Sequence, residues 1–194
     1  RGVCGCNPCD VLFFLPAGIR PVKRNLECLN ALAEVHEIRQ CLKVVFAGPV
    51  LDAEYGERFF EALEHCKGFA CWIRAIPAEA MRFAYSGADV VLNASSSEGF
   101  SNVLLEAMAA GRPILASDIQ SNRIAVLGYP GEHPCGYLFK LENRADFINQ
   151  AIKLIDNEQT RKSLAENGLK RSKEWPKPED EAKLLYNVYK NAVT

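Results

Sequence analysis

The stretch DVVLNASSSEGFSNVLLEAMAAGRPILASD, residues 89–118, decides how this chain folds. It begins within a short apolar run, residues 88–94, which the serine- and glycine-containing segment 95–100 cannot continue. We therefore expect a buried strand that ends in a loop. Ser101 or Asn102 can cap a helix after this loop, because both residue types are favoured at helix N-termini.

The expected helix ends at Gly111, which Pro113 follows, and residues 114–117 read as the next strand. A strand, a glycine loop and a helix N-terminus together place free backbone N–H groups and a positive dipole end at the carboxyl edge of a sheet. This arrangement favours phosphate. The sequence therefore predicts an anion site at this edge.

Two carboxylates, Glu98 and Glu106, flank the start of this helix. Glu106 lies roughly 7 Å along the helix axis, at about 1.5 Å per residue, and can meet a group beyond the phosphate such as a ribose diol. Glu98 lies in the loop and faces whatever hangs from the other side of a diphosphate. The alternatives are a capping acid for Glu98 and an exposed helix residue for Glu106.

The rest of the chain alternates strands and helices, which indicates an α/β fold with a doubly wound, Rossmann-like parallel sheet, helices on both faces and further helices at the C-terminus. We expect one domain over residues 11–194, preceded by a separate segment over residues 1–10. The expected strands are 11–15, 42–47, 70–73 and 136–139, and the expected helices are 25–38, 55–66, 77–85, 144–156, 159–173 and 179–192, with a shorter unit from Arg123 before the last strand.

Composition supports one sizeable globular domain of 194 residues with a formal net charge of −1. Such a balance provides no global field that would attract nucleic acid or an acidic membrane. The longest apolar runs, such as 11–17, are far shorter than the roughly 20 residues of a transmembrane helix. The first residues lack the apolar core of a signal peptide. We expect a cytoplasmic protein without a transmembrane segment.

Eight cysteines raise the question of disulfides or a metal site. Five of them are scattered through expected helices and strands, as free core thiols are: Cys28, Cys41, Cys66, Cys71 and Cys135. Cys4, Cys6 and Cys9 form a C-x-C-x2-C group near the start of the sequence. No histidine stands at finger spacing from this group, so we expect no metal. The role of the three cysteines stays open.

The pair Glu98 and Glu106 is embedded in the pattern S-x-x-E-G-F-x-x-x-x-L-E-A-M-A-x-G-x-P-[IV], with a strand on either side. This pattern resembles the signature of glycosyltransferase family 4 (group 1), whose members have the GT-B fold of two facing Rossmann-like domains. The resemblance runs more loosely from Val11 to about Val193 and covers only the C-terminal, donor-binding half of such an enzyme.

The resemblance implies transfer of a sugar from a nucleotide-diphosphate donor with retention of configuration, without a metal or a cofactor apart from the nucleotide sugar as substrate. The chain has no Asp-x-Asp pair, which agrees with metal independence. In a longer form, the N-terminal GT-B half would bind an acceptor that the sequence does not identify. The nucleobase, the sugar and the oligomeric state also stay open.

Family members place a glycine and two bases in the loop after the first strand, where they neutralise the diphosphate. Gly18, Arg20 and Lys23 match this pattern, although the family has a longer gap between its bases. Which of Arg20, Lys23 and Arg24 takes each role stays open. A solvated basic turn is the alternative.

By the same resemblance, Glu98 accepts hydroxyl groups of the transferred sugar, and Glu106 accepts the ribose hydroxyls. The backbone N–H groups that hold the sugar and the diphosphate are those around Gly99, Phe100, Ser101 and Asn102. A third loop, residues 118–123, often contacts the sugar or acceptor in the family. Here Gln120 and Ser121 replace the usual glycines, and an ordinary polar turn is equally compatible with the sequence.

Three functions fit these observations. The first is a retaining glycosyltransferase in which Glu98, Arg20 and Lys23 are the catalytic residues; preorganised positive groups would stabilise the departing diphosphate. The second is a module that binds a nucleotide sugar without transferring it. The third is a sugar-nucleotide epimerase on the same architecture. Turnover with an acceptor, binding without turnover, and a changed free sugar nucleotide would distinguish them.

Overall fold

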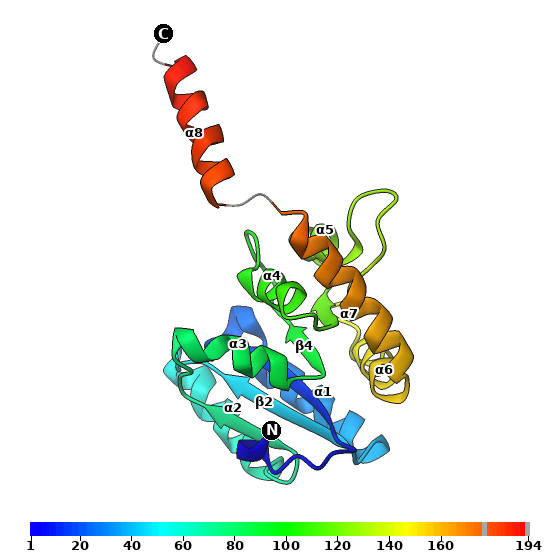
Figure 1. Cartoon of the computed structure of the whole chain (residues 1–194). Coiled ribbons are helices and arrows are strands. Elements are labelled where there is room, and N and C mark those ends of the chain that lie inside the picture. The colour runs from blue at the N-terminus through cyan, green and yellow to red at the C-terminus, as the bar shows by residue number, and fades with distance from the viewer. Residues whose placement is uncertain (176–177, 193–194) are drawn as a thin grey trace.

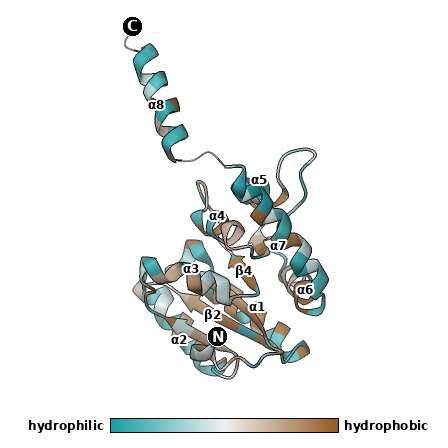
Figure 2. Ribbon diagram, in the orientation of Figure 1, coloured by the Kyte–Doolittle hydropathy of each residue, from teal (hydrophilic) through white to brown (hydrophobic). Residues whose placement is uncertain are grey.

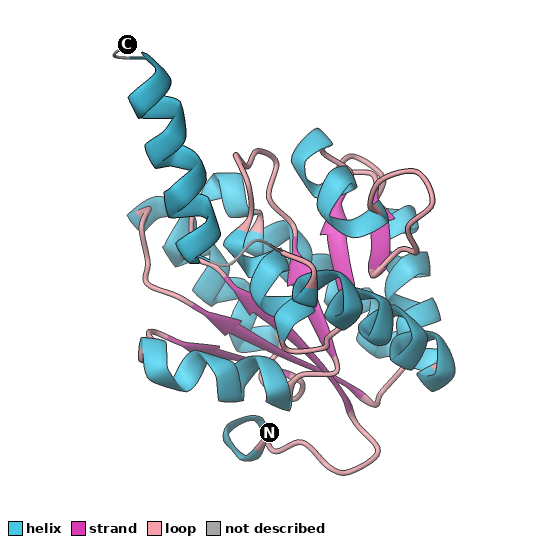
Figure 3. Cartoon of the chain, turned by 45° about the horizontal axis from the view of Figure 1, so that its top comes forward, coloured by secondary structure: helices cyan, strands magenta, loops and turns pink. Residues whose placement is uncertain are grey.

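The computed structural model describes residues 1–175 and 178–192. One parallel sheet of six strands lies between two layers of helices (Figures 1 and 3). The strands are β1 (Val11–Pro16), β2 (Leu42–Ala47), β3 (Ala70–Ile73), β4 (Val90–Asn93), β5 (Ile114–Ser117) and β6 (Gly136–Phe139). Every strand except β1 follows a helix or long crossover segment, as parallel neighbours require.

The strand order is β3-β2-β1-β4-β5-β6, so the direction of winding changes between β1 and β4. β1 pairs with β2 along its whole length, whereas it pairs with β4 at Phe13 and Phe14. The predicted doubly wound parallel sheet is confirmed. In such a sheet, ligands bind outside the carboxyl ends of the strands where the order reverses, here the ends of β1 and β4.

Helices cover both faces of the sheet. One face carries α1 (Asn25–Ile38), α2 (Ala53–His65) and α6 (Arg144–Asp156), and the other carries α3 (Ala78–Gly87), α4 (Asn102–Ala109) and α5 (Gln120–Leu127). α7 (Glu158–Lys173) packs along α4 and α6, and α8 (Pro178–Ala192) follows it. Two short 3₁₀ turns are η1 (Gly2–Cys4) and η2 (Pro21–Lys23). None of the described helices is long and apolar enough to cross a membrane.

The central strands are apolar on both sides because helices bury both faces. Phe13, Phe46 and Phe59 lie in the core under α1 and α2, and Phe46 and Phe59 meet edge to face with centroids 5.1 Å apart. Phe14 lies in the opposite core, where it packs edge-on against Tyr85 of α3. Since each side has its own core, the central strands are fixed from both directions.

The structure settles two segments that the sequence pattern leaves open. Residues 118–123 are not simply a polar turn, because α5 begins at Gln120 and takes in Arg123. The last helix does not cover this domain. Figure 2 shows α8 extending away from the sheet. Its large apolar side chains are each more than half exposed: Leu184, Leu185, Tyr186, Val188 and Tyr189.

A close backbone approach joins the loops after β1 and β2. A Cβ atom on Gly48, whose φ is +153°, would lie 2.5 Å from the carbonyl oxygen of Ala17, so only glycine fits there. Ile19 extends the contact by a parallel bridge to Val50. The loop that leads from β1 toward η2 is therefore held in place by its neighbour.

Candidate functional site

Two loops from opposite sides of the switch point meet at the carboxyl edge of the sheet. η2 presents Lys23 from the loop after β1, and the loop after β4 presents Glu98. The Lys23 Nζ lies 2.6 Å from Glu98 Oε1, and the two side chains are only 16% and 14% exposed. Ser96 N–H donates to the Val22 carbonyl at 2.9 Å and ties the two loops together. The structure thus brings together two of the three residues that we predict to be catalytic.

The Glu98 carboxylate is also held from below by the end of β4. Ser95 Oγ donates to Glu98 Oε1 at 2.7 Å, and Asn93 Nδ2 approaches the same oxygen at 3.4 Å. Asn93 Nδ2 also donates to Ser101 Oγ at 2.8 Å. Asn93, Ser95 and Ser101 are buried. Because these groups are buried and hydrogen-bonded, they orient the carboxylate.

Two opposing effects set the acidity of Glu98. Burial disfavours its charged form, but hydrogen bonds from Lys23 and Ser95 and the charge of Lys23 outweigh that effect and lower its pKa below the ordinary value of 4.5. Glu98 is therefore an ionised acceptor at neutral pH.

This shift predicts a pH dependence of stability. A carboxyl group whose pKa is lower in the folded state stabilises the fold above its unfolded pKa and loses this contribution as the pH falls through the folded value. We expect wild type to exceed Glu98→Gln in free energy of unfolding at neutral pH and the difference to shrink below pH 4.5. Urea denaturation at neutral pH and below pH 4.5 measures this difference, and Glu166→Gln, at an exposed position, serves as the control. A difference that is the same at both pH values would contradict the lowered pKa of Glu98.

The N-terminus of α4 opens beside this ion pair. Ser101 stands at the N-cap position, but its hydroxyl accepts from Asn93 and makes no capping bond to the helix. The described part of the chain supplies no acceptor for the backbone N–H groups of Gly99 through Asn102. Phe100 is 58% exposed at the tip of the loop. These N–H groups and the helix dipole form a surface suited to an anion.

Glu106 lies one turn further along α4 and is exposed. The hydroxyl of Tyr85 donates to its Oε2 at 2.6 Å, and Tyr85 is only 2% exposed. Burial and the bonded carboxylate raise the pKa of Tyr85, which therefore remains a donor. A cavity of about 400 Å³ between α3 and α4 is lined by Tyr85, Glu106 and Arg82. Tyr85 thus orients the Glu106 carboxylate through Oε2 and leaves Oε1 available to a ligand.

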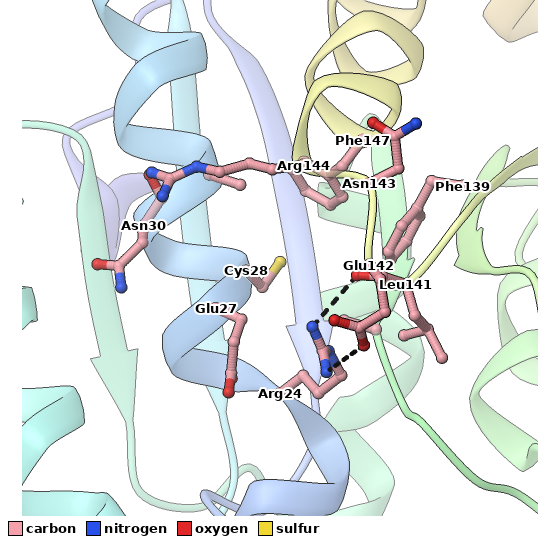
Figure 4. A pocket seen from close by; sticks show the side chains of 12 residues that line it. Arg24, Glu27, Cys28, Asn30, Phe139, Leu141, Glu142, Asn143, Arg144 and Phe147 are labelled. Carbon is pink, nitrogen blue, oxygen red and sulfur yellow. Dashed lines mark hydrogen bonds and ion pairs between the residues drawn. The ribbon is translucent and has the colours of Figure 1, made fainter.

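For the remaining bases of the first loop, no hydrogen bond or ion pair with Glu98 is found among the described residues. Arg20 is exposed. Arg24 adopts a left-handed backbone with φ of +53°, and its guanidinium donates to the Leu141 carbonyl at 3.2 Å and to Glu142 at 3.4 Å (Figure 4). The geometry therefore separates the open alternatives: Lys23 is beside Glu98, and Arg24 points toward the loop between β6 and α6.

Gly18 lies in the same loop, where a Cβ atom would come 2.6 Å from the side chain of Leu51. Two cavities meet at the buried Ala94. The one beside Glu98 measures only about 10 Å³, so a sugar ring must lie outside it. The other measures about 240 Å³ and lies between α1 and α6, with Arg24, Cys28 and Phe139 among its lining residues (Figure 4).

Sequence reasoning missed three residues that support the site. Tyr85 lies in a predicted helix but 21 positions before Glu106, and nothing in its spacing signals the contact. Ser117 Oγ donates to the Ser95 carbonyl, and Asn122 Nδ2 donates to both the carbonyl and Oγ of Ser117 at 3.0 Å. Ser117 lies next to the segment 118–123 and Asn122 lies within it. The polarity of this segment is the one sequence signal that could have pointed to these two residues. This segment therefore supports the Glu98 loop from behind.

No cluster of three or more His, Cys, Asp or Glu residues in the described ranges is arranged to hold a metal.

The chain is similar in sequence to curated proteins and in fold to solved structures. The chain is 26% identical over 156 residues to glycosyltransferase 1 domain-containing protein 1 of Xenopus tropicalis, which covers 80% of the chain and 43% of that protein. It is 37% identical over 82 residues to an uncharacterized glycosyltransferase of Methanocaldococcus jannaschii, covering 42% of the chain and 22% of that protein. The chain thus spans less than half the length of these relatives.

Solved structures show the same architecture. A sucrose-phosphate synthase from Thermosynechococcus elongatus superposes with a TM-score of 0.78 at 22% identity, over 96% of the chain and 47% of that structure. HepE of Anabaena, solved in complex with UDP, superposes with a TM-score of 0.73 at 17% identity, over 84% of the chain and 44% of that structure. The profile of the family described as glycosyl transferases group 1 matches residues 10–171, and the chain belongs to this family.

Proposed function

We propose that this chain is the donor-binding domain of a retaining glycosyltransferase that uses a nucleotide-diphosphate sugar. The observation that carries the proposal is the contact between Lys23 and Glu98 at the switch point, next to N–H groups at the start of α4 that find no acceptor among the described residues. A cation, an ionised acceptor and a helix N-terminus together match a donor that carries a diphosphate and a hydroxylated sugar.

In this proposal each group has one task. Lys23 and the N–H groups from Gly99 to Asn102 bind the diphosphate and stabilise the charge that develops on it as it leaves. Glu98 accepts sugar hydroxyls, while Glu106, held by Tyr85, accepts those of the ribose. Arg20 is exposed and would also contact the diphosphate. Gly18 would let the backbone of the same loop come close to the diphosphate.

Donor binding involves an exchange of partners at Glu98. Without donor, Lys23 and Glu98 neutralise each other. When the diphosphate binds, Lys23 turns to it and the sugar hydroxyls replace the ammonium at Glu98. The exchange leaves the ammonium paired with the diphosphate and the carboxylate hydrogen-bonded to the sugar hydroxyls, which limits the desolvation cost of binding.

Glu98 is not proposed as a nucleophile. A two-carboxylate scheme needs both acids beside the anomeric carbon. Glu106 instead lines a separate cavity with Tyr85, so its carboxylate serves the far end of the nucleotide. Transfer without a metal is part of the proposal, since Lys23 and the helix N-terminus supply the positive charge that a metal would provide.

The acceptor side belongs to a longer form of the protein. The chain spans less than half of its relatives, and the exposed apolar side chains of α8 have no cover from this domain. We propose that a first GT-B half supplies the acceptor site and contacts this helix. We also propose a cytoplasmic location, because Cys28, Cys66 and Cys135 are buried in the core as free cysteines commonly are.

The same partial coverage favours a second candidate, a module that binds a nucleotide sugar but does not transfer it by itself. An epimerase has no comparable support. HepE has been solved with UDP and with UDP and glucose, so uridine nucleotides are the first donors to test.

Calorimetric titration with uridine, guanosine and adenosine diphosphates and their glucose conjugates tests the proposal. One base series is expected to bind, and Glu106→Gln is expected to weaken both members of that series about tenfold, because it removes a charged hydrogen-bond acceptor. Gln can still accept from Tyr85, so the fold should be unaffected.

The control for this titration is Glu166→Gln, on the exposed surface of α7, which should bind as wild type does. Absence of binding across the whole panel, with a protein that unfolds cooperatively, would overturn the proposal. If Glu106→Gln bound with the same affinity as wild type, Glu106 would not be the residue that contacts the ribose.

A further inference from the structure

The cysteine group near the start of the sequence is brought against the edge of the sheet. Cys4 lies at the end of η1, and Cys71 lies in β3, the outermost strand on that side. Their Sγ atoms are 3.0 Å apart, although the residues are separated by 67 positions. Both side chains, like that of Cys6, pack against the core that contains Leu12 and Phe14.

We propose that Cys4 and Cys71 form a reversible disulfide that cross-links residues 1–10 to the edge strand β3. The sulfur atoms need to approach by only about 1 Å to reach the roughly 2.05 Å length of an S–S bond. Both residues are only partly buried, so a small oxidant can reach them. This contact distinguishes Cys4 and Cys71 from the buried Cys28, Cys66 and Cys135.

The surroundings hold the segment in position for this reaction. Arg1 donates to Asp89 Oδ2 at 2.8 Å, and the same oxygen accepts the backbone N–H of Leu12 at 2.8 Å. Asp10 Oδ2 accepts the N–H of Asn7. Residues 1–10 are thus anchored by Arg1 at one end and continue directly into β1 at the other, so Cys4 is held beside Cys71.

The two thiols differ in acidity in a way that suits exchange. The hydrogen bond between them lowers the pKa of Cys71 and raises that of Cys4. The thiolate is the attacking species in exchange, so Cys71 reacts first. Its thiolate attacks glutathione disulfide to give a mixed disulfide and one glutathione thiolate.

The second step closes the bond. Cys4 loses its proton to solvent, and its sulfur attacks the Cys71 sulfur of the mixed disulfide and displaces a second glutathione thiolate. In total, two protein thiols are oxidised, one glutathione disulfide is reduced to two glutathiones, and no further oxidant is needed. Reduced glutathione reverses both steps, so the cross-link follows the redox state of the surrounding pool.

The test is to incubate the purified chain in glutathione buffers of decreasing reduced-to-oxidised ratio, block free thiols with N-ethylmaleimide, and map the tryptic peptides. Trypsin releases Cys71 alone in the peptide 68–74, so its partner is read by fragmentation. We expect this peptide joined to Cys4 in wild type and in Cys6→Ser, and no cross-link in Cys71→Ser or Cys4→Ser.

A second measurement is thermal unfolding. Closing so long a loop is expected to raise the Tm of the oxidised wild type by about 5–10 °C over the reduced protein, whereas Cys71→Ser should show no redox dependence. A bond from Cys71 to Cys6 or Cys9, a bond between Cys4 and Cys6, or glutathione adducts that never close would each overturn the proposal.

Discussion

Replacing Glu98 with glutamine is expected to weaken binding of the nucleotide sugar by about tenfold to hundredfold and to leave binding of the nucleoside diphosphate within about threefold of wild type. The reason is the division of tasks at the site. In the proposed function Glu98 accepts the sugar hydroxyls as an ionised group, whereas Lys23, which lies beside it, and the start of α4 bind the diphosphate. Calorimetry with UDP and UDP-glucose, or with the matching pair from the base that binds, measures both values.

Glu106→Gln serves as the matched variant, because it is expected to weaken both ligands equally. The roles of Glu98 and Glu106 are thereby distinguished by the ratio of the affinities for the nucleotide sugar and the nucleoside diphosphate, which should change only in Glu98→Gln. An equal loss of both ligands in Glu98→Gln would show that Glu98 acts only by positioning Lys23. Retained affinity for both would remove Glu98 from the site.

Replacing Gly48 with alanine is expected to lower the Tm by about 5–10 °C and to weaken diphosphate binding. The added Cβ would lie 2.5 Å from the carbonyl oxygen of Ala17 and 2.7 Å from the backbone nitrogen of Gly18, so backbone must move. Overpacking and a strained φ together destabilise a domain by about 2–3 kcal/mol. Because the displaced loop leads to Lys23, the site shifts with it. Circular dichroism melting and calorimetry measure the two effects.

Gly68 is the control, because a Cβ atom there would meet nothing within 4 Å. Gly68→Ala is expected to melt and bind as wild type does. If the two variants melted at the same temperature, the close approach at Gly48 would have no energetic weight, and the placement of the β1 loop would need another cause.

Local patterns predicted most of the fold. β2, β3, β5, α1 and α6 have the predicted bounds, because each is an uninterrupted apolar or amphipathic run between turn residues. Errors occurred where short polar helices begin: α5 starts at Gln120, although its first turn reads as a polar loop. Helix propensity is a weak signal there, and packing of Ala125 and Val126 against the core decides the outcome.

The candidate site was predictable in its residues but not in its pairings. The signature places Glu98 in a loop and Glu106 on a helix, and the structure agrees. Three bases in one loop are indistinguishable in the sequence. The left-handed backbone of Arg24 separates them, because it turns its side chain toward Leu141 while Lys23 reaches Glu98. Such a choice depends on tertiary contacts that no local pattern encodes.

The winding of the sheet also affects how the protein matures. Lys23 and Glu98 are 75 positions apart and come from the two halves of the sheet, which meet between β1 and β4. A nascent chain that has not yet added β4 to β1 holds only half of the ion pair. A ligand that binds only the assembled site stabilises completed molecules by mass action and offers nothing to partly folded ones. If the proposed donor is such a ligand, adding it would raise the population of chains whose two half-sheets have come together.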